Sequence, residues 1–272
     1  MSVPIIVCGA AGRMGRTLVQ LVQHHGEATL HAAVEMRGHP AIGADAGQLA
    51  GIGDIGVRIT DDYRAVAASD TVALEFTSPR ATLEHLRVAV EKQAGMVIGT
   101  TGYDEAERRE LDDLAPQTRS VVAANMSVGV NVLLKLVAVA AGILGSEFDP
   151  EIVEIHHRLK VDSPSGTALA LARALAAPLG RRVDTDARFG RQGMIGKRTD
   201  SEIGIMALRG GDAVGDHTVI FAGMGERLEL THRAQSRDCL ARGALRAALW
   251  LAPQPKGRYG MADVLGLQER KE

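Results

Sequence analysis

One short segment of the sequence combines side chains that can move protons with backbone that can bind an anion. His156, His157 and Lys160 stand directly before a Ser-Pro-Ser-Gly-Thr run at 163–167. An imidazole titrates near neutral pH, and an ammonium group can pair with a carboxylate or deliver a proton. The Ser-Pro pair predicts a helix start, with free N–H groups at its positive end. We therefore expect a substrate carboxylate at the N–H groups of Ser165, Gly166 and Thr167, flanked by His156 and Lys160.

Three simpler interpretations compete with this one. Adjacent strand residues point to opposite faces, so at most one of His156 and His157 faces a ligand unless the strand has already ended. Together with Asp162 they would suggest a metal, but no other Cys or His cluster completes a ligand set, and no metal site is predicted. In the third interpretation, these side chains are ordinary polar residues of the surface. The remaining histidines are scattered, and we expect them to be structural or surface residues: His24, His25, His31, His39, His85, His217 and His232.

A glycine-rich loop follows the first apolar run and opens the first helix pattern. Residues 9–15 have the spacing G-x-x-G-x-x-G, in the position where a dinucleotide pyrophosphate meets free backbone N–H groups. Glu35 stands twenty positions after Gly15, at the end of the second predicted strand, where a carboxylate can accept bonds from ribose hydroxyls. A tight turn that packs a helix on a sheet is the alternative. The loop candidates for cofactor binding are Gly9, Ala10, Ala11, Gly12, Arg13 and Met14.

The type of nicotinamide cofactor depends on the residues around Glu35. A carboxylate repels a ribose 2′-phosphate unless a cation compensates, and the next residues are Met36 and Arg37. NADH is slightly favoured, with NADPH left open. Two further predicted strand ends would face the same crevice, although either could be a simple turn. Their cofactor-binding candidates are Gly99, Thr100, Thr101, Ala123, Ala124, Asn125 and Met126.

The elements that must position these groups alternate in the first half of the chain. Short apolar runs at 5–8, 30–34, 57–59, 72–76, 96–98 and 120–123 predict strands, with helices at 13–23 and at 81–93, the latter capped by Gly95. Residues 36–56 show no period and predict a loop or short helix. This pattern predicts an α/β fold, a Rossmann-like doubly wound parallel sheet.

The second half of the chain shows a different pattern of apolar residues. Residues 128–144 are apolar on almost every face and predict a buried connecting helix capped by Gly145. A strand at 152–156, a helix at 164–177 and hairpin-like strands at 203–208, 217–222 and 227–231 predict a second, α+β domain with a largely antiparallel portion. Residues 239–251 predict a final amphipathic helix followed by a Pro/Gly tail.

Composition narrows the classes of partner. The chain of 272 residues has a formal net charge of −2 and only 3% aromatic residues, which disfavours nucleic-acid binding. Cys8 and Cys239 lie far apart in the sequence, so no disulfide framework is expected. Residues 132–144 form the longest apolar run, which contains Lys135 and is too short to span a bilayer. With no signal-peptide pattern, we expect a cytoplasmic protein without membrane contact.

The sequence resembles the 4-hydroxy-tetrahydrodipicolinate reductase family, formerly called dihydrodipicolinate reductase, over essentially its whole length. The resemblance rests on the motifs at 9–15, 97–102, 124–131, 154–167 and 209–218, of which the fourth is highly specific. It implies NADH- or NADPH-dependent reduction of (2S,4S)-4-hydroxy-2,3,4,5-tetrahydrodipicolinate to (S)-2,3,4,5-tetrahydrodipicolinate, with loss of water, in lysine biosynthesis through diaminopimelate.

The resemblance also implies roles and assembly. His156 would be the proton donor and acceptor, and Lys160 a proton donor. His157 and the pair Gly166 and Thr167 would bind substrate. A dinucleotide-binding domain of residues 1–127 plus 237–272 would accompany a substrate-binding and tetramerisation domain of residues 128–236, in a homotetramer. The glycine loop, Glu35 and residues 99–101 and 123–126 match cofactor contacts.

Some positions depart from the family pattern. Many relatives have arginine where this chain has Met36, an aromatic residue where it has Met126, and aspartate where it has Glu75. Two alternatives remain open at this point: another two-domain NAD(P)-dependent amino or imino acid dehydrogenase, and a non-catalytic nucleotide-sensing module. The histidine and lysine cluster has no purpose in a pure sensor.

Overall fold

The computed structural model describes residues 2–268 of the chain. These residues form two compact units, one of residues 2–128 and 238–268 and one of residues 129–237. The first unit thus combines an N-terminal and a C-terminal part of the chain. Its sheet is built from seven strands in the order β12-β6-β5-β4-β1-β2-β3, and every neighbouring pair is parallel. The strands are β1 (Val3–Cys8), β2 (Ala28–Val34), β3 (Ile59–Thr60), β4 (Val72–Glu75), β5 (Gly95–Ile98), β6 (Arg119–Val122) and β12 (Gly257–Tyr259).

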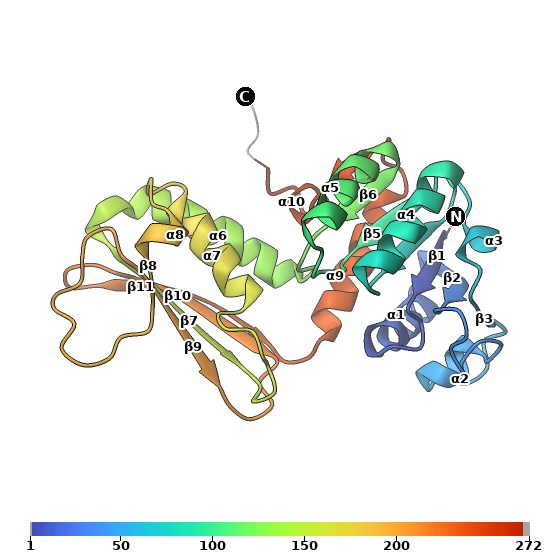
Figure 1. The fold of residues 1–272 in the computed structure, drawn as a ribbon, viewed down its shortest axis with the longest axis horizontal. Coiled ribbons are helices and arrows are strands. Elements are labelled where there is room, and N and C mark those ends of the chain that lie inside the picture. Colours follow the sequence, from blue (N-terminus) through green and yellow to red (C-terminus); the bar gives the residue numbers. More distant parts are fainter. Residues whose placement is uncertain (1, 269–272) are drawn as a thin grey trace. The chain divides into compact units, whose positions relative to one another are not determined.

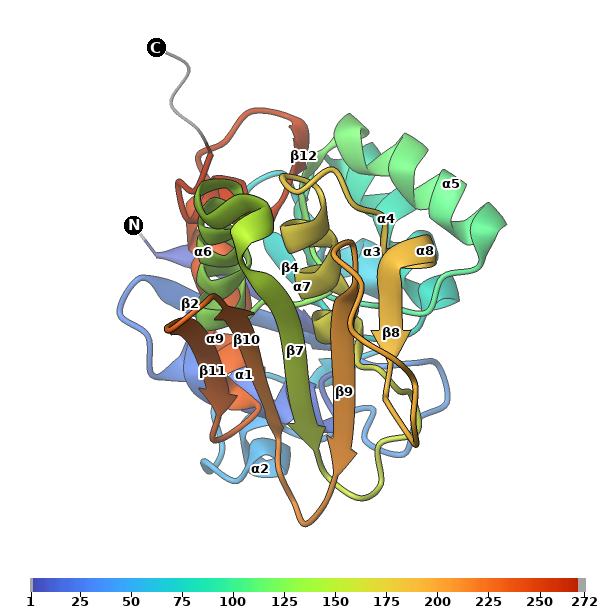
Figure 2. The ribbon, with the colours of Figure 1, turned by 90° about the vertical axis from the view of Figure 1, so that its left-hand side faces the viewer.

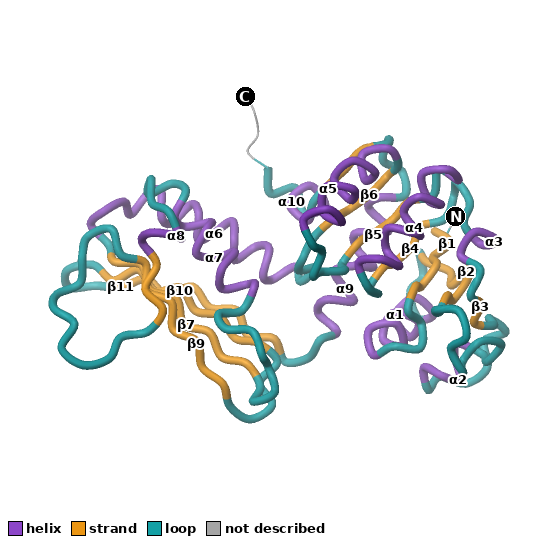
Figure 3. Tube along the Cα trace, in the orientation of Figure 1, coloured by secondary structure: helices purple, strands orange, loops and turns teal. Residues whose placement is uncertain are grey.

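Helices cover both faces of this sheet (Figure 1, Figure 3). Alternate residues of β1 show why: Ile5 and Val7 belong to one buried cluster, and Ile6 and Cys8 to the other. The first cluster includes residues of α1 (Arg13–Gln23), α2 (Ala46–Ala50), α9 (Asp238–Leu251) and α10 (Met261–Val264). The second includes residues of α3 (Tyr63–Val66), α4 (Pro79–Lys92) and α5 (Glu105–Leu114). The doubly wound parallel sheet predicted from the sequence is confirmed.

The second unit contains a mixed sheet in the order β11-β10-β7-β9-β8 (Figure 2). Its strands are β7 (Asp149–His156), β8 (Ala187–Phe189), β9 (Ile203–Arg209), β10 (Gly215–Ala222) and β11 (Arg227–Ala234). β10 pairs antiparallel with β7 and β11, whereas β9 pairs parallel with β7 and β8. The prediction that 203–208 and 217–222 form a hairpin is therefore wrong. β7 lies between them, because its alternating apolar residues supply a central strand with two neighbours.

Two helices pack on one face of this mixed sheet, α6 (Val128–Leu144) and α7 (Gly166–Ala176), and a short helix, α8 (Val183–Asp186), precedes β8. Their buried residues join inward-facing strand residues in one core, for example Val137, Leu171, Ile152 and Val219. The other sheet face, which carries Val153 and other partly exposed residues, has no helix of this unit on it (Figure 2). Short 3₁₀ turns at Ala115–Gln117 and Gly145–Glu147 follow α5 and α6.

The helix α6 is less buried than the sequence suggests. Leu136, Val139 and Ile143 remain exposed on it, Ile143 to 79%, so the prediction of a buried helix holds for one face only. The stretch Val128–Glu147 also has the length and apolar composition of a membrane-crossing helix, contrary to the shorter run expected. Because one face packs in the core of the second unit, the same features suit an element of a globular domain.

Three element boundaries differ from the prediction. The helix α7 begins at Gly166 with Ser165 as its N-cap, not at Pro164 with Ser163, and the Ser163–Pro164 peptide is cis. The end of α4 is capped by Gln93 in the left-handed conformation, while Gly95 already lies in β5. The expected tail contains β12, which pairs with β6 and extends the parallel sheet.

Candidate active site

The glycine loop of the first unit has the geometry of an anion cradle. Gly9 directly follows β1 and has a φ of +71°, a left-handed conformation that suits glycine. A Cβ on Gly15 would overlap the carbonyl oxygen of Gly9, so only glycine lets α1 approach the loop this closely. Gly12 is the N-cap of α1, and no side chain caps the helix. The open helix end suits a pyrophosphate.

Glu35 lies directly after β2 and is held by backbone donors. Its Oε2 accepts the N–H of Ala11 at 3.0 Å, and its Oε1 accepts the N–H of Met36 at 2.9 Å. The carboxylate lines a cavity of about 560 Å³ together with Gly9, Gly12 and Met36. Each carboxylate oxygen keeps a further lone pair for a ligand hydroxyl. The same cavity is also lined by the cationic side chains of Arg37 and Arg80.

The ends of β5 and β6 line a second cavity of the first unit, of about 360 Å³. Thr100, Thr101, Ala123 and Ala124 contribute to it. The side chain of Met126 is buried in the core, because α9 packs against it. Only the backbone of this residue can therefore contact a ligand. Gly99 is required by packing: a Cβ there would overlap the ring of Phe76, which follows β4. Asn125 accepts the N–H of Ser127 at 2.9 Å.

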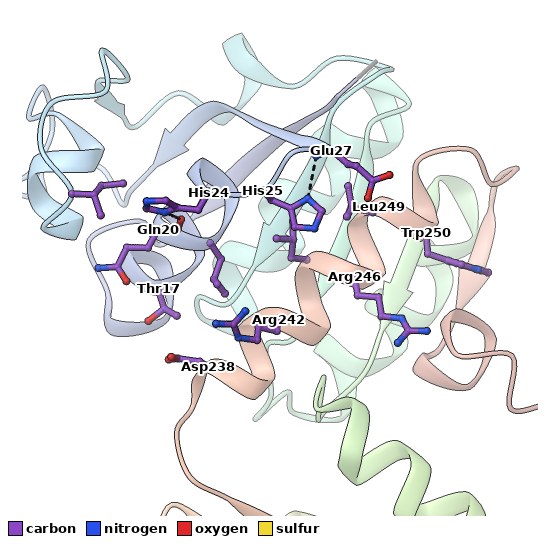
Figure 4. Close-up of a pocket in the computed structure, with 13 residues that line it drawn as sticks. Thr17, Gln20, His24, His25, Glu27, Asp238, Arg242, Arg246, Leu249 and Trp250 are labelled. Atoms are coloured by element: carbon purple, nitrogen blue, oxygen red, sulfur yellow. Dashed lines mark hydrogen bonds between the residues drawn. The ribbon is translucent and has the colours of Figure 1, made fainter.

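A further cavity of about 950 Å³ lies between α1 and α9 (Figure 4). Its walls include Gln20, His24, Arg242, Arg246 and Trp250. None of the residues predicted to bind cofactor or substrate lines it, so we do not assign the reaction to this groove.

The chemistry of the second unit centres on His156, the last residue of β7. Its Nδ1 lies 2.6 Å from Oε2 of Glu154, a carboxylate with no exposed surface. Arg209, the last residue of β9, donates to both oxygens of this carboxylate at 2.9 and 3.1 Å. Burial acts to raise the pKa of Glu154, but the hydrogen bonds from Arg209, His156 and the Ser165 N–H outweigh it and lower the pKa. Glu154 is therefore an ionised, fixed acceptor for the imidazole.

Gly215 lies beside the opposite edge of the His156 ring, which carries Nε2. A Cβ on Gly215 would lie 2.8 Å from Nε2 of His156. The ring of His217 stands edge-on to that of His156, with centroids 5.1 Å apart, and its Nε2 lies 3.0 Å from Oγ of Ser165. Burial lowers the pKa of His217 to about 4, so this second imidazole is neutral at physiological pH.

Lys160 lies in the loop after β7 and is oriented by a local partner. Its Nζ donates to both oxygens of Asp162, at 2.7 and 2.8 Å, and this bond lowers the pKa of Asp162. His157 is half-buried, with its Nε2 3.5 Å from a guanidinium nitrogen of Arg237. Arg209 donates both to Glu154 and to the carbonyl oxygen of Asp162, so His156, Lys160 and the start of α7 lie in one region of the second unit.

One predicted anion contact is wrong. The N–H of Ser165 donates to Oε1 of Glu154 at 3.0 Å, and the buried Oγ of Ser165 caps α7 by accepting the N–H of Ala168. Ser165 is therefore occupied by the protein, because the helix starts two residues later than expected. Gly166 is exposed, with open space where a Cβ would stand.

Sequence reasoning missed three members of this cluster: Glu154, Arg209 and His217. Glu154 is two positions before His156 on the same strand, so strand periodicity could have placed the two side chains on one face. Arg209 and His217 reach the site only through the pairing of β9 and β10 with β7.

These features define a class of protein, a two-domain NAD(P)-dependent oxidoreductase with a dinucleotide-binding parallel sheet and a second domain built on a mixed sheet. Family models for the N-terminus and C-terminus of dihydrodipicolinate reductase match residues 3–126 and 129–265. The chain is 48% identical to a 4-hydroxy-tetrahydrodipicolinate reductase of Pelobacter propionicus, over 98% of this chain and 100% of the relative. It is 49% identical, over the same shares, to the enzyme of the same name from Geotalea uraniireducens.

Solved structures share the fold. A dipicolinate-bound dihydrodipicolinate reductase from Paenisporosarcina sp. TG-14 matches with a TM-score of 0.74 at 22% identity, over 97% of this chain and 99% of that one. An amine dehydrogenase from Mycobacterium smegmatis matches with a TM-score of 0.60 at 15% identity, over 94% of each chain. The chain belongs to the dihydrodipicolinate reductase family, whose activity, 4-hydroxy-tetrahydrodipicolinate reduction in lysine and diaminopimelate biosynthesis, it carries.

Proposed function

We propose that the histidine held by Glu154 and Arg209 is the proton-transfer centre of this reductase. The reaction reduces (2S,4S)-4-hydroxy-2,3,4,5-tetrahydrodipicolinate to (S)-2,3,4,5-tetrahydrodipicolinate as the 4-hydroxyl leaves as water. The nicotinamide supplies the hydride when bound. The observation that carries the proposal is the 2.6 Å contact between His156 Nδ1 and a buried carboxylate, itself bound by two nitrogens of Arg209.

Glu154 determines which nitrogen of His156 is available. With an ionised acceptor at Nδ1, that nitrogen carries a proton, and Nε2 is left to exchange a proton with the substrate. Arg209 neutralises the carboxylate and fixes its plane. The neutral ring of His217 adds no competing positive charge beside His156. His156 is thus the proton donor and acceptor of the proposed mechanism.

Lys160 and the start of α7 supply the positive groups that a dicarboxylate needs. Lys160 has two proposed roles: it binds a substrate carboxylate, and it donates a proton. Asp162 holds its ammonium group in place. His157 and the N–H groups of Gly166 and Thr167 are the proposed contacts to the substrate anions. Ser165 contributes indirectly, by capping α7 and contacting His217.

The first unit is the proposed dinucleotide-binding domain, and the second the substrate-binding domain. Glu35 would accept the adenosine ribose hydroxyls, and the segments after β5 and β6 would hold the nicotinamide ribose. The fixed Glu35 carboxylate favours NADH, because it repels a 2′-phosphate. Arg37 and Arg80 line the same cavity and offer compensating charge, so we propose that NADPH is also used.

The exposed apolar surface of the second unit supports a homotetramer. Leu136, Val139 and Ile143 of α6 and Leu228 and Leu230 of β11 line one apolar hollow, and β11 is an edge strand of its sheet. A second copy would cover this surface and the helix-free sheet face. Cys8 and Cys239 are not joined in a disulfide, which fits the reducing cytoplasm, where we place the enzyme.

The test is oxidation of NADH and NADPH, followed by loss of nicotinamide absorbance, with freshly made product of dihydrodipicolinate synthase. We expect wild-type turnover, and a loss of about 10²- to 10⁴-fold in kcat for both His156→Ala and Lys160→Ala. Wild-type turnover by both variants with saturating substrate would overturn the assignment. Comparable turnover of simpler oxo or imino acids would instead indicate a general amino or imino acid dehydrogenase.

A further inference from the structure

A buried carboxylate in the first unit takes no part in the mechanism above. Glu75 is the last residue of β4 and has no exposed surface. In the sheet it stands level with Cys8, the last residue of β1, and with Ile98, the last residue of β5. Glu75 therefore lies directly beneath the three strand ends from which the glycine loop, the Phe76–Thr77 segment and the Gly99–Thr101 segment emerge.

The partners of this carboxylate come from the loop after β4 and from α4. Oε2 lies 2.7 Å from Nδ1 of His85. Oε1 accepts a hydrogen bond from the Thr77 hydroxyl and lies 3.4 Å from the hydroxyl oxygen of Thr82. Within residues 2–268, Glu75 forms no ion pair with lysine or arginine. The pairing differs in this respect from that of Glu154, which Arg209 neutralises.

The hydrogen bonds continue from Glu75 to a residue proposed to bind the cofactor. The Thr82 hydroxyl donates to Oγ1 of Thr100 at 2.8 Å, and the N–H of Thr77 donates to the same oxygen at 3.2 Å. Thr77 and His85 line the cavity that contains Glu35, and Thr100 lines the cavity at the end of β5. One buried carboxylate is thus connected to both cavities proposed for the dinucleotide.

A contribution to folding stability does not explain why the Glu75 carboxylate is buried. Removing a carboxylate from water is costly, and replacing a buried polar cluster with well-packed apolar residues is often neutral or stabilising. A connected polar network does, however, hold its members in one arrangement. Two members, Thr77 and Thr100, stand two positions after the ends of β4 and β5, where their arrangement determines what the neighbouring backbone N–H groups can reach.

We propose that Glu75 and His85 form a positioning pair for the cofactor: they orient the hydroxyls of Thr77 and Thr82, and through them Thr100, so that the segments after β4 and β5 are ready to bind the dinucleotide. The proposal rests on the cofactor site proposed above. Neither residue exchanges a proton with the substrate in this role.

A metal ion is the competing explanation for the cluster. Three possible ligand atoms lie within 4.8 Å of one another: the sulfur of Cys8, a carboxylate oxygen of Glu75 and a ring nitrogen of His85. A thiolate would be needed, and burial raises the pKa of the Cys8 thiol well above its usual value, before the nearby Glu75 charge raises it further. Because both oxygens of Glu75 are already engaged, by Thr77 and by His85, we infer a hydrogen-bonded network, and the chelator measurement below tests for a metal.

The test measures the Kd of NADH for the full-length protein without substrate, by nicotinamide fluorescence, together with KM and kcat. We expect Glu75→Gln to raise the Kd and the cofactor KM about tenfold, as loss of a hydrogen bond to a charged group does, with kcat at saturating cofactor and the dicarboxylate KM unchanged. Glu75→Asp keeps the acceptor and should restore part of the affinity. Thr82→Val should weaken binding in the same way.

Cys8→Ala provides the matched control, because it removes another buried polar group of the same cluster. It should lower the melting temperature without changing the Kd more than about twofold, since Cys8 contacts Glu75 and not the threonines that lead to Thr100. If Glu75→Gln does not fold, Thr82→Val carries the test.

The outcomes separate the two proposals. A wild-type protein that binds neither NADH nor NADPH contradicts the proposed cofactor site itself. Wild-type affinity in Glu75→Gln or, where that variant does not fold, in Thr82→Val overturns the positioning pair alone, as does an equal rise in the KM of the dicarboxylate. Loss of wild-type NADH binding on treatment with a chelator would also overturn it, in favour of a metal.

Discussion

The Glu154→Gln substitution offers the sharpest test of the proposed proton-transfer centre. The carboxylate is fully buried and receives bonds from the Arg209 guanidinium, the Ser165 N–H and the ring of His156. Glutamine keeps the shape but loses the charge and one of the two acceptor atoms. Arg209 is then left partly buried without a counter-charge. Breaking a buried ion pair from one side costs about 3–5 kcal/mol, and we expect a loss of unfolding free energy near the lower end of that range because Arg209 keeps some solvent contact.

The catalytic effect should exceed what destabilisation explains. Without an ionised acceptor at Nδ1, His156 loses both its fixed orientation and its preferred tautomer, and we expect kcat to fall about 10²- to 10⁴-fold at neutral pH. The matched control is Glu151→Gln on the same strand, whose carboxylate is paired with Arg191 and Arg198 away from His156. This control should lose stability without losing kcat.

The pH dependence of stability gives an independent check. The pKa of Glu154 is lower in the folded protein than in the unfolded chain, so its contribution is present above the ordinary glutamate pKa of about 4.3. That contribution is lost as the pH falls through the folded pKa. The gap in unfolding free energy between wild type and Glu154→Gln, measured in urea, should therefore be largest near neutral pH and shrink in acid. A kcat within twofold of wild type, or a gap that grows in acid, would refute the reasoning.

Further predictions concern both units. Gly15→Ala should abolish NADH binding in calorimetry, because the new Cβ would overlap the Gly9 carbonyl, and retained affinity would contradict the geometry. Ser165→Ala removes the N-cap of α7 and should cost about 1 kcal/mol of unfolding free energy in urea; no change would mean that the cap is dispensable. Glu35→Gln should raise the ratio of kcat/KM for NADPH to that for NADH, since repulsion of the 2′-phosphate is removed; an unchanged ratio would exclude that role. Ile143→Asp places a charge on the exposed face of α6 and should dissociate the proposed tetramer in light scattering, whereas an unchanged mass would move the interface elsewhere.

Local patterns in the sequence predicted most of the first unit. Alternating apolar runs and helix patterns indicated a doubly wound sheet because each such signal arises within one element and needs no distant partner. The pattern failed where pairing was decided by distant residues. Glycine and proline at 253–257 read as a tail, yet β12 completes the sheet by pairing with β6.

The candidate site divides in the same way. The sequence by itself determined the glycine loop, Glu35 and the run from His156 to Thr167, because the chemistry of each lies in neighbouring residues. Only the tertiary structure decided what surrounds His156: β9 and β10 lie on opposite sides of β7, which brings Arg209 and His217 to it from more than fifty positions away. The tertiary structure also decided that the Ser165 N–H donates to Glu154 while the Ser165 side chain caps α7. A buried carboxylate needs hydrogen-bond donors, and packing determines which groups are close enough to donate.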